Sequence, residues 1–276
     1  MSDADAFAGH RARRRFSQNF LVDPGVVERI VAAVAPRAED RIVEIGPGRG
    51  ALTAQLLAAP GELVVLEIDR DLARGLAERF PELRIVEGDA LRVDYETLFP
   101  DTAPFRVLGN LPYHVTSPLL FRLLRHAPRM RDAHFMLQDE VVQRMAAAPG
   151  EKAWGRLGVM VRYHCRVDAL FAVPPEAFSP RPQVRSRLVR LERYASLPHP
   201  ARDYALLERV VREAFSRRRK TLRNALRGLA GDAAFAAAEI DPALRPEALD
   251  VDAFVALANA LAASGAAGAP ADAGGA

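Results

Sequence analysis

Short apolar runs alternate with longer helical segments over the first half of this chain, and that alternation limits the folds it can adopt. The apolar runs lie at residues 42–45, 62–68, 83–87, 105–108 and 133–137, and their lengths are typical of buried strands. Helical patterns end near residue 57 and cover residues 70–79 and 117–125. Strands that alternate with helices form parallel sheets covered by helices on both faces. The sequence therefore predicts an α/β fold.

Further elements are predicted on either side of this region. Residues 24–35 should form a helix, because Asp23 suits the N-cap and Pro24 suits the first helical position. Residues 155–164 are predicted to be helical and residues 183–193 to form a strand, with a proline-rich loop at residues 173–182.

The last third of the chain is predicted to be helical only, at residues 203–216, 218–229, 232–239 and 251–263. We place a domain boundary in the linker at residues 196–200. A larger domain of residues 16–196 would then precede a small all-α domain of residues 200–263. Residues 1–15 are expected to form a mobile basic arm. Residues 264–276, rich in Gly and Ala, are expected to be a disordered tail.

The composition excludes several classes of protein. No apolar run approaches the ~20 residues of a membrane span, and the N-terminus lacks the apolar core of a secretory signal. Cys165 is the single cysteine, so no internal disulfide can form, and the scattered histidines predict no metal site. We therefore expect a cytoplasmic monomer that does not bind membranes.

Positive charge is concentrated in one part of the chain. Residues 151–230 contain 18 Arg or Lys and 7 Asp or Glu, whereas residues 231–276 contain one Arg and seven acids. The strongest cluster consists of Arg217, Arg218, Arg219, Lys220, Arg223 and Arg227. On a helix, residues 219, 223 and 227 would share one face. A band of this kind favours a polyanionic partner such as RNA, and the alternative is a solvated basic face. The acid-poor segment at residues 177–191 favours the binding interpretation.

A glycine-rich turn follows the first predicted strand. Gly46, Gly48 and Gly50 would let a ligand approach the backbone, and Glu67 follows Gly46 by 21 positions at the end of the second strand. A carboxylate there can accept hydrogen bonds from both ribose hydroxyls, and Asp89, after the third strand, can read an adenine amine. These features predict a nucleoside-containing cofactor. A nicotinamide cofactor and a turn without ligand are the alternatives.

Glu44, just before that turn, distinguishes between possible cofactors. A carboxylate at this position would repel a pyrophosphate, whereas it suits the sulfonium and ammonium groups of S-adenosylmethionine. The spacing of the glycines is also one residue shorter than the usual dinucleotide fingerprint. Both features favour S-adenosylmethionine.

The tetrapeptide Asn110-Leu111-Pro112-Tyr113 follows the fourth predicted strand. Ligands of open α/β sheets bind at the carboxyl ends of strands, so this loop should line the site. The Asn110 side-chain oxygen and the Leu111 carbonyl could hold the hydrogens of an adenine amine and direct its lone pair to a methyl group. Pro112 would stiffen the loop and Tyr113 could stack on the base. The alternative is an ordinary turn.

Six motifs in order resemble the ribosomal RNA adenine dimethyltransferase family over residues 11–263, with its bacterial small-subunit members the most similar. Besides the glycine turn and the tetrapeptide at 110–113, they are the segments at residues 16–21, 154–160, 178–184 and 214–224. Ser17 departs from the family's usual Gly, and Ser186-Arg187 replaces a usual Ser-Ala. The resemblance implies a Rossmann-like methyltransferase sheet. It also implies cofactor contacts at Asn19, Leu21, Gly46, Glu67, Asp89 and Asn110.

The resemblance further implies a reaction and a target. The chain would transfer methyl groups from S-adenosylmethionine to two adjacent adenosines in the 3′-terminal hairpin loop of 16S rRNA, within an immature small subunit. Phe178 would stack on the flipped base opposite Tyr113, and its alternative is a core aromatic. Two other functions remain open at this point. One is a large-subunit rRNA adenine methylase, and the other is an assembly factor whose RNA binding matters more than methylation.

Overall fold

The computed structural model describes residues 18–59, 61–112, 115–217 and 219–264. These residues fall into two compact units. Unit 1 contains the described residues up to Gln143 together with Cys165–Arg193, and unit 2 contains Arg144–His164 together with the described residues from Tyr194 onward. This division differs from the predicted boundary at residues 196–200, because Arg144–His164 belongs to unit 2 although it precedes the last strands of unit 1. The predicted arm at residues 1–15 and most of the tail at 264–276 lie outside the described residues.

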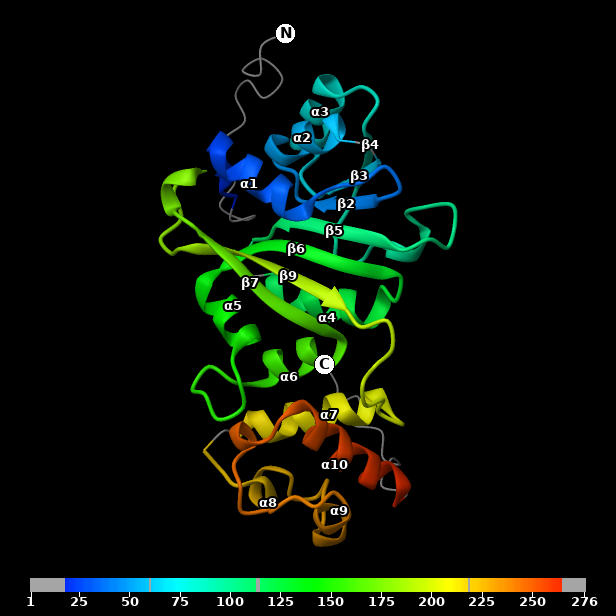
Figure 1. The fold of residues 1–276 in the computed structure, drawn as a ribbon, viewed down its shortest axis with the longest axis vertical. Helices are drawn as coiled ribbons and strands as arrows, with labels where there is room; N and C mark the ends of the chain where they lie inside the picture. Colours follow the sequence, from blue (N-terminus) through cyan, green and yellow to red (C-terminus); the bar gives the residue numbers. More distant parts are fainter. Residues whose placement is uncertain (1–17, 60, 113–114, 218, 265–276) are drawn as a thin grey trace, which may run out of the picture. The chain divides into compact units, whose positions relative to one another are not determined.

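Unit 1 is built on a seven-stranded sheet in the order β4-β3-β2-β5-β6-β9-β7 (Figure 1). Its parallel strands are β2 (Arg41–Ile45), β3 (Glu62–Glu67), β4 (Arg84–Glu87), β5 (Phe105–Asn110) and β6 (Met130–Gln138). Two antiparallel strands, β9 (Ser186–Arg193) and β7 (Cys165–Val173), complete the sheet. The predicted α/β fold is confirmed.

Both faces of the sheet are covered. Helices α1 (Pro24–Val34) and α2 (Ala51–Ala58) pack on Ile42 and Leu108 in one core cluster, and α3 (Arg70–Arg79) packs on Val65 in another. Val43 and Val107 pair across β2 and β5 and point to the opposite face, since side chains alternate along a strand. Both of these valines are fully buried. Helix α4 (Thr116–His126) joins β5 to β6, and α5 (Asp139–Ala146) follows β6.

The predicted start of α1 is confirmed. The Asp23 carboxylate accepts hydrogen bonds from the backbone amides of Gly25 and Val26 at 2.9 and 3.1 Å, and Pro24 is the first helical residue. Such a cap typically stabilises a helix by about 1 kcal/mol. It fixes the point at which the chain leaves β1 (Phe20–Leu21) and enters the helix.

Several features of unit 1 were not predicted. Strand β7 has exposed residues on both of its faces, so buried and exposed residues do not alternate regularly along it. The proline-rich loop contains a short 3₁₀ turn, η3 (Pro175–Ala177), and the two-residue strand β8 (Phe178–Ser179), which pairs with β1. A second 3₁₀ turn, η2 (Tyr95–Thr97), follows β4. Pairing of β1 with β8 brings the N-terminal motif beside the motif at 178–184.

Unit 2 is helical, as predicted for its C-terminal part. It contains α6 (Arg156–His164), α7 (Tyr204–Ser216), α8 (Leu222–Ala225), α9 (Asp232–Ala237), η4 (Pro246–Ala248) and α10 (Val251–Ala263). Trp154 is buried, and its indole N–H donates to the carbonyl of Leu249 at 2.9 Å. None of the helices in the described part of the chain is long and apolar enough to cross a membrane.

The predicted helix at residues 218–229 is wrong. Among residues 219–229, which the structure describes, only α8 is helical, and its first amides donate to a distant segment: Leu222 N–H to the Leu244 carbonyl and Arg223 N–H to the Pro242 carbonyl. The chain leaves the helix through Gly228, whose φ of +83° ends helical geometry. The backbone conformation of residues 219–229 is therefore set by contacts within unit 2 and not by the local sequence pattern.

Candidate functional site

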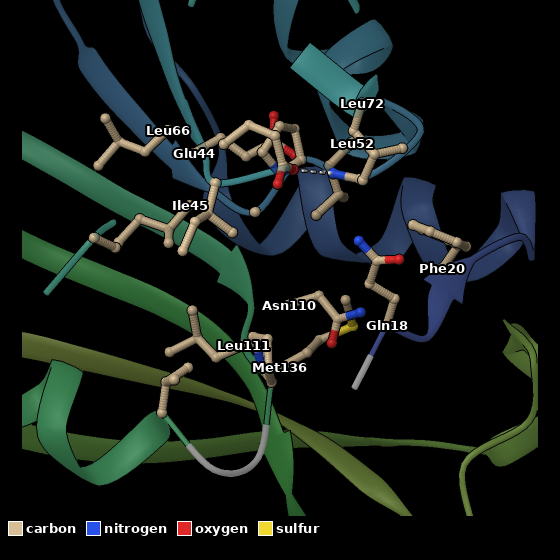
Figure 2. A pocket seen from close by; sticks show the side chains of 18 of the residues that line it. Gln18, Phe20, Glu44, Ile45, Leu52, Leu66, Leu72, Asn110, Leu111 and Met136 are labelled. Carbon is tan, nitrogen blue, oxygen red and sulfur yellow. Dashed lines mark hydrogen bonds between the residues drawn. The ribbon is translucent and has the colours of Figure 1, made fainter. Parts of the chain in front are cut away.

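A cavity of about 170 Å³ opens at the carboxyl ends of the parallel strands of unit 1 (Figure 2). Its wall comes from β1, from the ends of β2, β3 and β5, and from the turn after β4. The structure brings all six predicted cofactor-contacting residues to this wall, together with three predicted catalytic ones. They are Asn19, Leu21, Gly46, Glu67, Asp89, Asn110, Leu111, Pro112 and Phe178.

Gly46 and Gly48 of the glycine turn line the cavity. Gly46, Gly48 and Gly50 all have positive φ angles, of 66°, 60° and 79°. A Cβ atom on Gly48 would lie 2.9 Å from the Phe20 ring, so a larger residue would clash there as well as strain the backbone. The turn can therefore present its backbone directly to a ligand, as the sequence predicted.

Two buried carboxyl groups line the cavity. The Glu44 side chain accepts a hydrogen bond from the Thr53 hydroxyl at 2.7 Å, and Glu67 accepts from the backbone amides of Asp69 at 2.9 Å and Gly48 at 3.4 Å. Burial raises the pKa of Glu44 to about 7 and the pKa of Glu67 to about 7. The ionised forms thus carry an unfavourable desolvation cost, which a cationic ligand would offset.

The turn at residues 88–93 closes another side of the cavity. The Asp89 carboxylate accepts from the backbone amide of Leu91 at 2.9 Å. Buried Tyr95 donates its hydroxyl to the Ala90 carbonyl at 2.8 Å, and Arg122 donates to the Val93 carbonyl at 2.7 Å. Asp89 is therefore held in a fixed loop.

Some lining residues were missed in the sequence. Gln18, Ile68 and Met136 all line the cavity. Ile68 directly follows Glu67 and is 48% exposed, which is unusual for a large apolar residue at a strand end. The apolar side chain next to Glu67 was the available signal in the sequence, whereas Met136 on β6 could be found only from strand pairing.

Asn110 occupies the last position of β5 and projects toward Gln18 in Figure 2. Its amide Nδ2 donates to the backbone carbonyl of Asn19 at 2.8 Å. Beyond it, the Pro112 carbonyl accepts from the Val115 amide at 3.1 Å and from the Thr116 hydroxyl at 3.2 Å, which forms the first turn of α4. Tyr113 and the neighbouring His114 lie outside the described residues.

Phe178 is a core aromatic, and its stacking on a base stays a prediction. Its side chain is 3% exposed and belongs to the core cluster beneath α1, and it also lines the cavity. Its backbone pairs with Leu21 through the β1–β8 ladder. The ring is therefore held rigidly at the cavity wall.

The predicted RNA-binding cluster lies in unit 2, in what we call the basic segment (residues 217–227). Five of its cations are exposed, and Arg218 lies outside the described residues; the five are Arg217, Arg219, Lys220, Arg223 and Arg227. The expectation that residues 219, 223 and 227 share one helix face is wrong, because α8 contains only residue 223 of these three. Arg223 forms an ion pair with Asp232, and Arg227 bonds to Asn224 at 3.1 Å.

The segment at residues 177–191 is less basic in the structure than its sequence indicated. Arg187 pairs with Asp139 on α5, and Arg190 pairs with Glu192 at 2.9 Å. Arg181 approaches Glu176 at 3.8 Å. Pairing of β6 with β9 brings Asp139 to this run, whereas Glu176 and Glu192 lie just beyond its two ends, so an acid count within residues 177–191 overstated the free positive charge.

A comparison with known proteins assigns the chain to a family. The family model described as "Ribosomal RNA adenine dimethylase" matches residues 9–263. The chain is 54% identical over 255 residues to "Ribosomal RNA small subunit methyltransferase A" of Pseudomonas syringae pv. syringae, covering 91% of this chain and 95% of that protein. It is 55% identical over 259 residues to the protein of the same name from Pseudomonas aeruginosa, covering 92% and 96%.

Solved structures are similar over most of the chain. A dimethyladenosine transferase from Plasmodium falciparum superposes with a TM-score of 0.74 at 26% identity, covering 86% of this chain and 95% of that one. The 23S rRNA methyltransferase ErmE superposes with a TM-score of 0.68 at 25% identity, covering 88% and 100%. Together with the sequence matches, these similarities confirm the predicted resemblance: the chain belongs to the ribosomal RNA adenine dimethylase family.

Proposed function

We propose that this protein transfers methyl groups from S-adenosylmethionine to the N6 amines of two adjacent adenosines in the 3′-terminal hairpin loop of 16S rRNA, during assembly of the small subunit. The names and high identity of its Pseudomonas relatives support the small-subunit target. The observation that carries the proposal is the amide of Asn110, oriented by a hydrogen bond at the wall of a cavity that contains two buried carboxyl groups.

The residues of the cavity fit S-adenosylmethionine. Glu44 and Glu67 have raised pKa values because they are buried, and a ligand with positive charge would favour their ionised forms. Glu67 would hold the ribose hydroxyls and Asp89 the adenine amine, while the turn at Gly46 and Gly48 would allow close approach of the ligand. When bound, the cofactor supplies a methyl group activated by its attachment to sulfonium.

The chain's own groups would prepare the acceptor amine. The lone pair of an adenine amine is delocalised into the ring and is weakly nucleophilic. Hydrogen bonds from the amine to the Asn110 oxygen and the Leu111 carbonyl would direct that lone pair toward the methyl group, and in-line displacement would follow from positioning. The amine becomes acidic once it is methylated, so loss of its proton requires no strong base.

The base and the RNA would be held by different groups. Phe178, rigid at the cavity wall, would stack on the flipped adenine opposite Tyr113. The exposed cations of the basic segment, Arg217, Arg219 and Lys220 foremost, would contact RNA phosphates. Arg218, Arg223 and Arg227 belong to the same proposed contact surface.

Mass spectrometry of rRNA nucleosides tests the proposal. Undermethylated small subunits and, in a parallel reaction, unmethylated large subunits are incubated with the enzyme and isotopically labelled S-adenosylmethionine, and both the modified nucleoside and its position are determined. We expect N6,N6-dimethyladenosine at two adjacent positions of 16S rRNA. Labelled adenosine in 23S rRNA instead would support the large-subunit alternative, and maturation of subunits without labelling would support a binding role.

A further inference from the structure

We propose that the backbone carbonyl of Asn19 is a positioning group for catalysis, which orients the Asn110 amide so that its oxygen faces the acceptor amine. The inference rests on the proposed function. It adds a role in turnover to a segment whose sequence predicted only cofactor contacts. We call this the N-terminal segment (residues 18–21).

The hydrogen bond itself assigns the two ends of the Asn110 amide. A backbone carbonyl can only accept, so the atom that lies 2.8 Å from the Asn19 oxygen must be the Asn110 nitrogen. The oxygen of the same planar group is then directed away from Asn19. Because Asn110 lines the cavity, a rotation of its amide by half a turn would replace an acceptor with a donor at the place where the amine must be held.

The first anchor of the N-terminal segment is polar. Gln18 donates its side-chain amide to the Asp69 carboxylate at 3.2 Å. Asp69 is almost fully buried, and its own backbone amide donates to Glu67 at 2.9 Å. The segment is therefore linked through one residue to the carboxylate proposed to hold the ribose.

The second anchor is apolar and is formed by Phe20 and Leu21. The Phe20 ring covers the turn at Gly48, and the Arg49 guanidinium lies 4.8 Å from the ring centroid. Leu21 pairs with Phe178 in the β1–β8 ladder. Phe20 and Leu21 are 7% and 8% exposed. Asn19 thus lies between two fixed neighbours, and its carbonyl has little freedom to move.

This arrangement predicts an effect on turnover rather than on affinity alone. A segment that only bound the cofactor would change KM for S-adenosylmethionine when disturbed, and saturating cofactor would restore the rate. A segment that also orients Asn110 would lower kcat at saturation, because the amide could then rotate away from its productive orientation.

The decisive variant is Asn110→Asp, which replaces the donor facing Asn19 by oxygen. An ionised carboxylate would be repelled by the Asn19 carbonyl, whereas a protonated carboxyl could donate to it and still accept from the amine. The other titratable groups that line the cavity in the described residues are Glu44, Glu67, Asp89 and Arg49. We expect the buried acids and the Asn19 carbonyl to raise the pKa of the introduced carboxyl, with Arg49 and the cofactor's positive charge opposing that shift.

Single-turnover rates are measured from pH 6 to pH 9 at saturating S-adenosylmethionine, on undermethylated small subunits. We expect the variant to be about a hundredfold slower than wild type at pH 8. The ratio of variant to wild-type rate should rise by about tenfold for each unit that the pH falls, because only the protonated form is competent. A variant as fast as wild type at pH 8, or one whose ratio is the same at every pH, would overturn the proposal.

A second variant keeps the test independent of the folding of the first. Gln18→Ala removes the polar anchor, and Gln143→Ala is its matched control, because Gln143 makes a comparable bond to Asp139 outside the cavity. We expect Gln18→Ala to lower kcat at saturating cofactor about tenfold or more, and the control to leave it unchanged. Wild-type kcat in Gln18→Ala would refute the positioning role. Failure of the proposed function itself is distinguishable, since wild-type enzyme would then produce no dimethyladenosine.

Discussion

The cavity of unit 1 and the basic segment of unit 2 were both predicted from motifs, but the structure builds them in opposite ways. The cavity is assembled from residues far apart in the sequence, and its two central acids are only 2% and 4% exposed. The basic segment is one contiguous stretch whose described cations are exposed to solvent, and its helix α8 is anchored where the amides of Leu222 and Arg223 donate to the carbonyls of Leu244 and Pro242. A motif whose residues must be buried is fixed by the fold, whereas the spacing of exposed charges leaves the backbone undetermined.

The largest expected effect is in the cavity. Asn110→Ala should reduce turnover by about a hundredfold or more at both methylation steps, the magnitude seen when one preorganised contact to a transition state is removed. RNA binding should persist, because the proposed phosphate contacts lie in the basic segment. Single-turnover assays on undermethylated subunits measure the rate, with Asn259→Ala on α10 as a matched control. A wild-type rate for Asn110→Ala would show that Asn110 does not hold the acceptor amine and serves only to form the turn.

The next effect concerns the buried acids. Glu67→Ala should weaken binding of S-adenosylmethionine by about 1.5–3 kcal/mol, since a charged hydrogen-bonding partner is lost. Titration calorimetry on the purified, folded variant measures this. Glu62→Ala serves as the control, because Glu62 lies at the opposite end of the same strand and is exposed. Equal affinities for Glu67→Ala and wild type would remove Glu67 from the cofactor site.

A smaller effect is expected in the basic segment, where cations with and without an ion pair can be compared. Arg219 and Lys220 form no ion pair within the described residues, whereas Arg223 is already paired with Asp232. Replacing Arg219 and Lys220 together by Ala should reduce the slope of log affinity against log salt by roughly 0.7–0.9 per lost phosphate contact. Arg223→Ala should change it less. Filter binding of an rRNA fragment over a salt series measures the slopes, and identical slopes for both variants and wild type would indicate a solvated surface.

The smallest expected effect on cofactor binding is its pH dependence, again in the cavity. The pKa values of Glu44 and Glu67 are raised by burial from 4.5 to about 7. The folded chain then binds more protons than the unfolded chain between these values, so stability without cofactor should fall as pH rises from about 4.5 to 7. Affinity for the positively charged cofactor should rise several-fold over pH 6 to 8, because ionised acids favour it.

Thermal melting measures how stability changes with pH, and titration calorimetry measures how cofactor affinity changes with pH. Glu44→Gln keeps an acceptor for the Thr53 hydroxyl but cannot ionise, so it should flatten each slope in part. The same slopes in Glu44→Gln and wild type would show that Glu44 is not the titrating group.

Most of the sheet and of the cavity could be predicted from the sequence. Strands β2 to β6 carry strong apolar runs, and the glycine turn and the residues at 110–113 lie where such strands end. What could not be predicted depends on long-range pairing. Strand β7 shows no regular burial pattern, and the acid that pairs with Arg187 is Asp139, 48 residues away in the sequence. The orientation of Asn110 depends on Asn19, which is 91 residues away in the sequence.

The interleaving of the two units has a consequence for how the chain is made. Helix α6 is synthesised before β7 and β9, yet it packs with α7 and α10 of unit 2. On a translating ribosome, the sheet of unit 1 lacks two strands until residue 193 has emerged, and α6 lacks its partners until residues 204–263 follow. Neither unit can be completed by a nascent chain that ends at residue 164. Helices α7 and α10 therefore complete a core to which α6, earlier in the chain, already belongs. Removing or replacing them would expose the apolar side of α6.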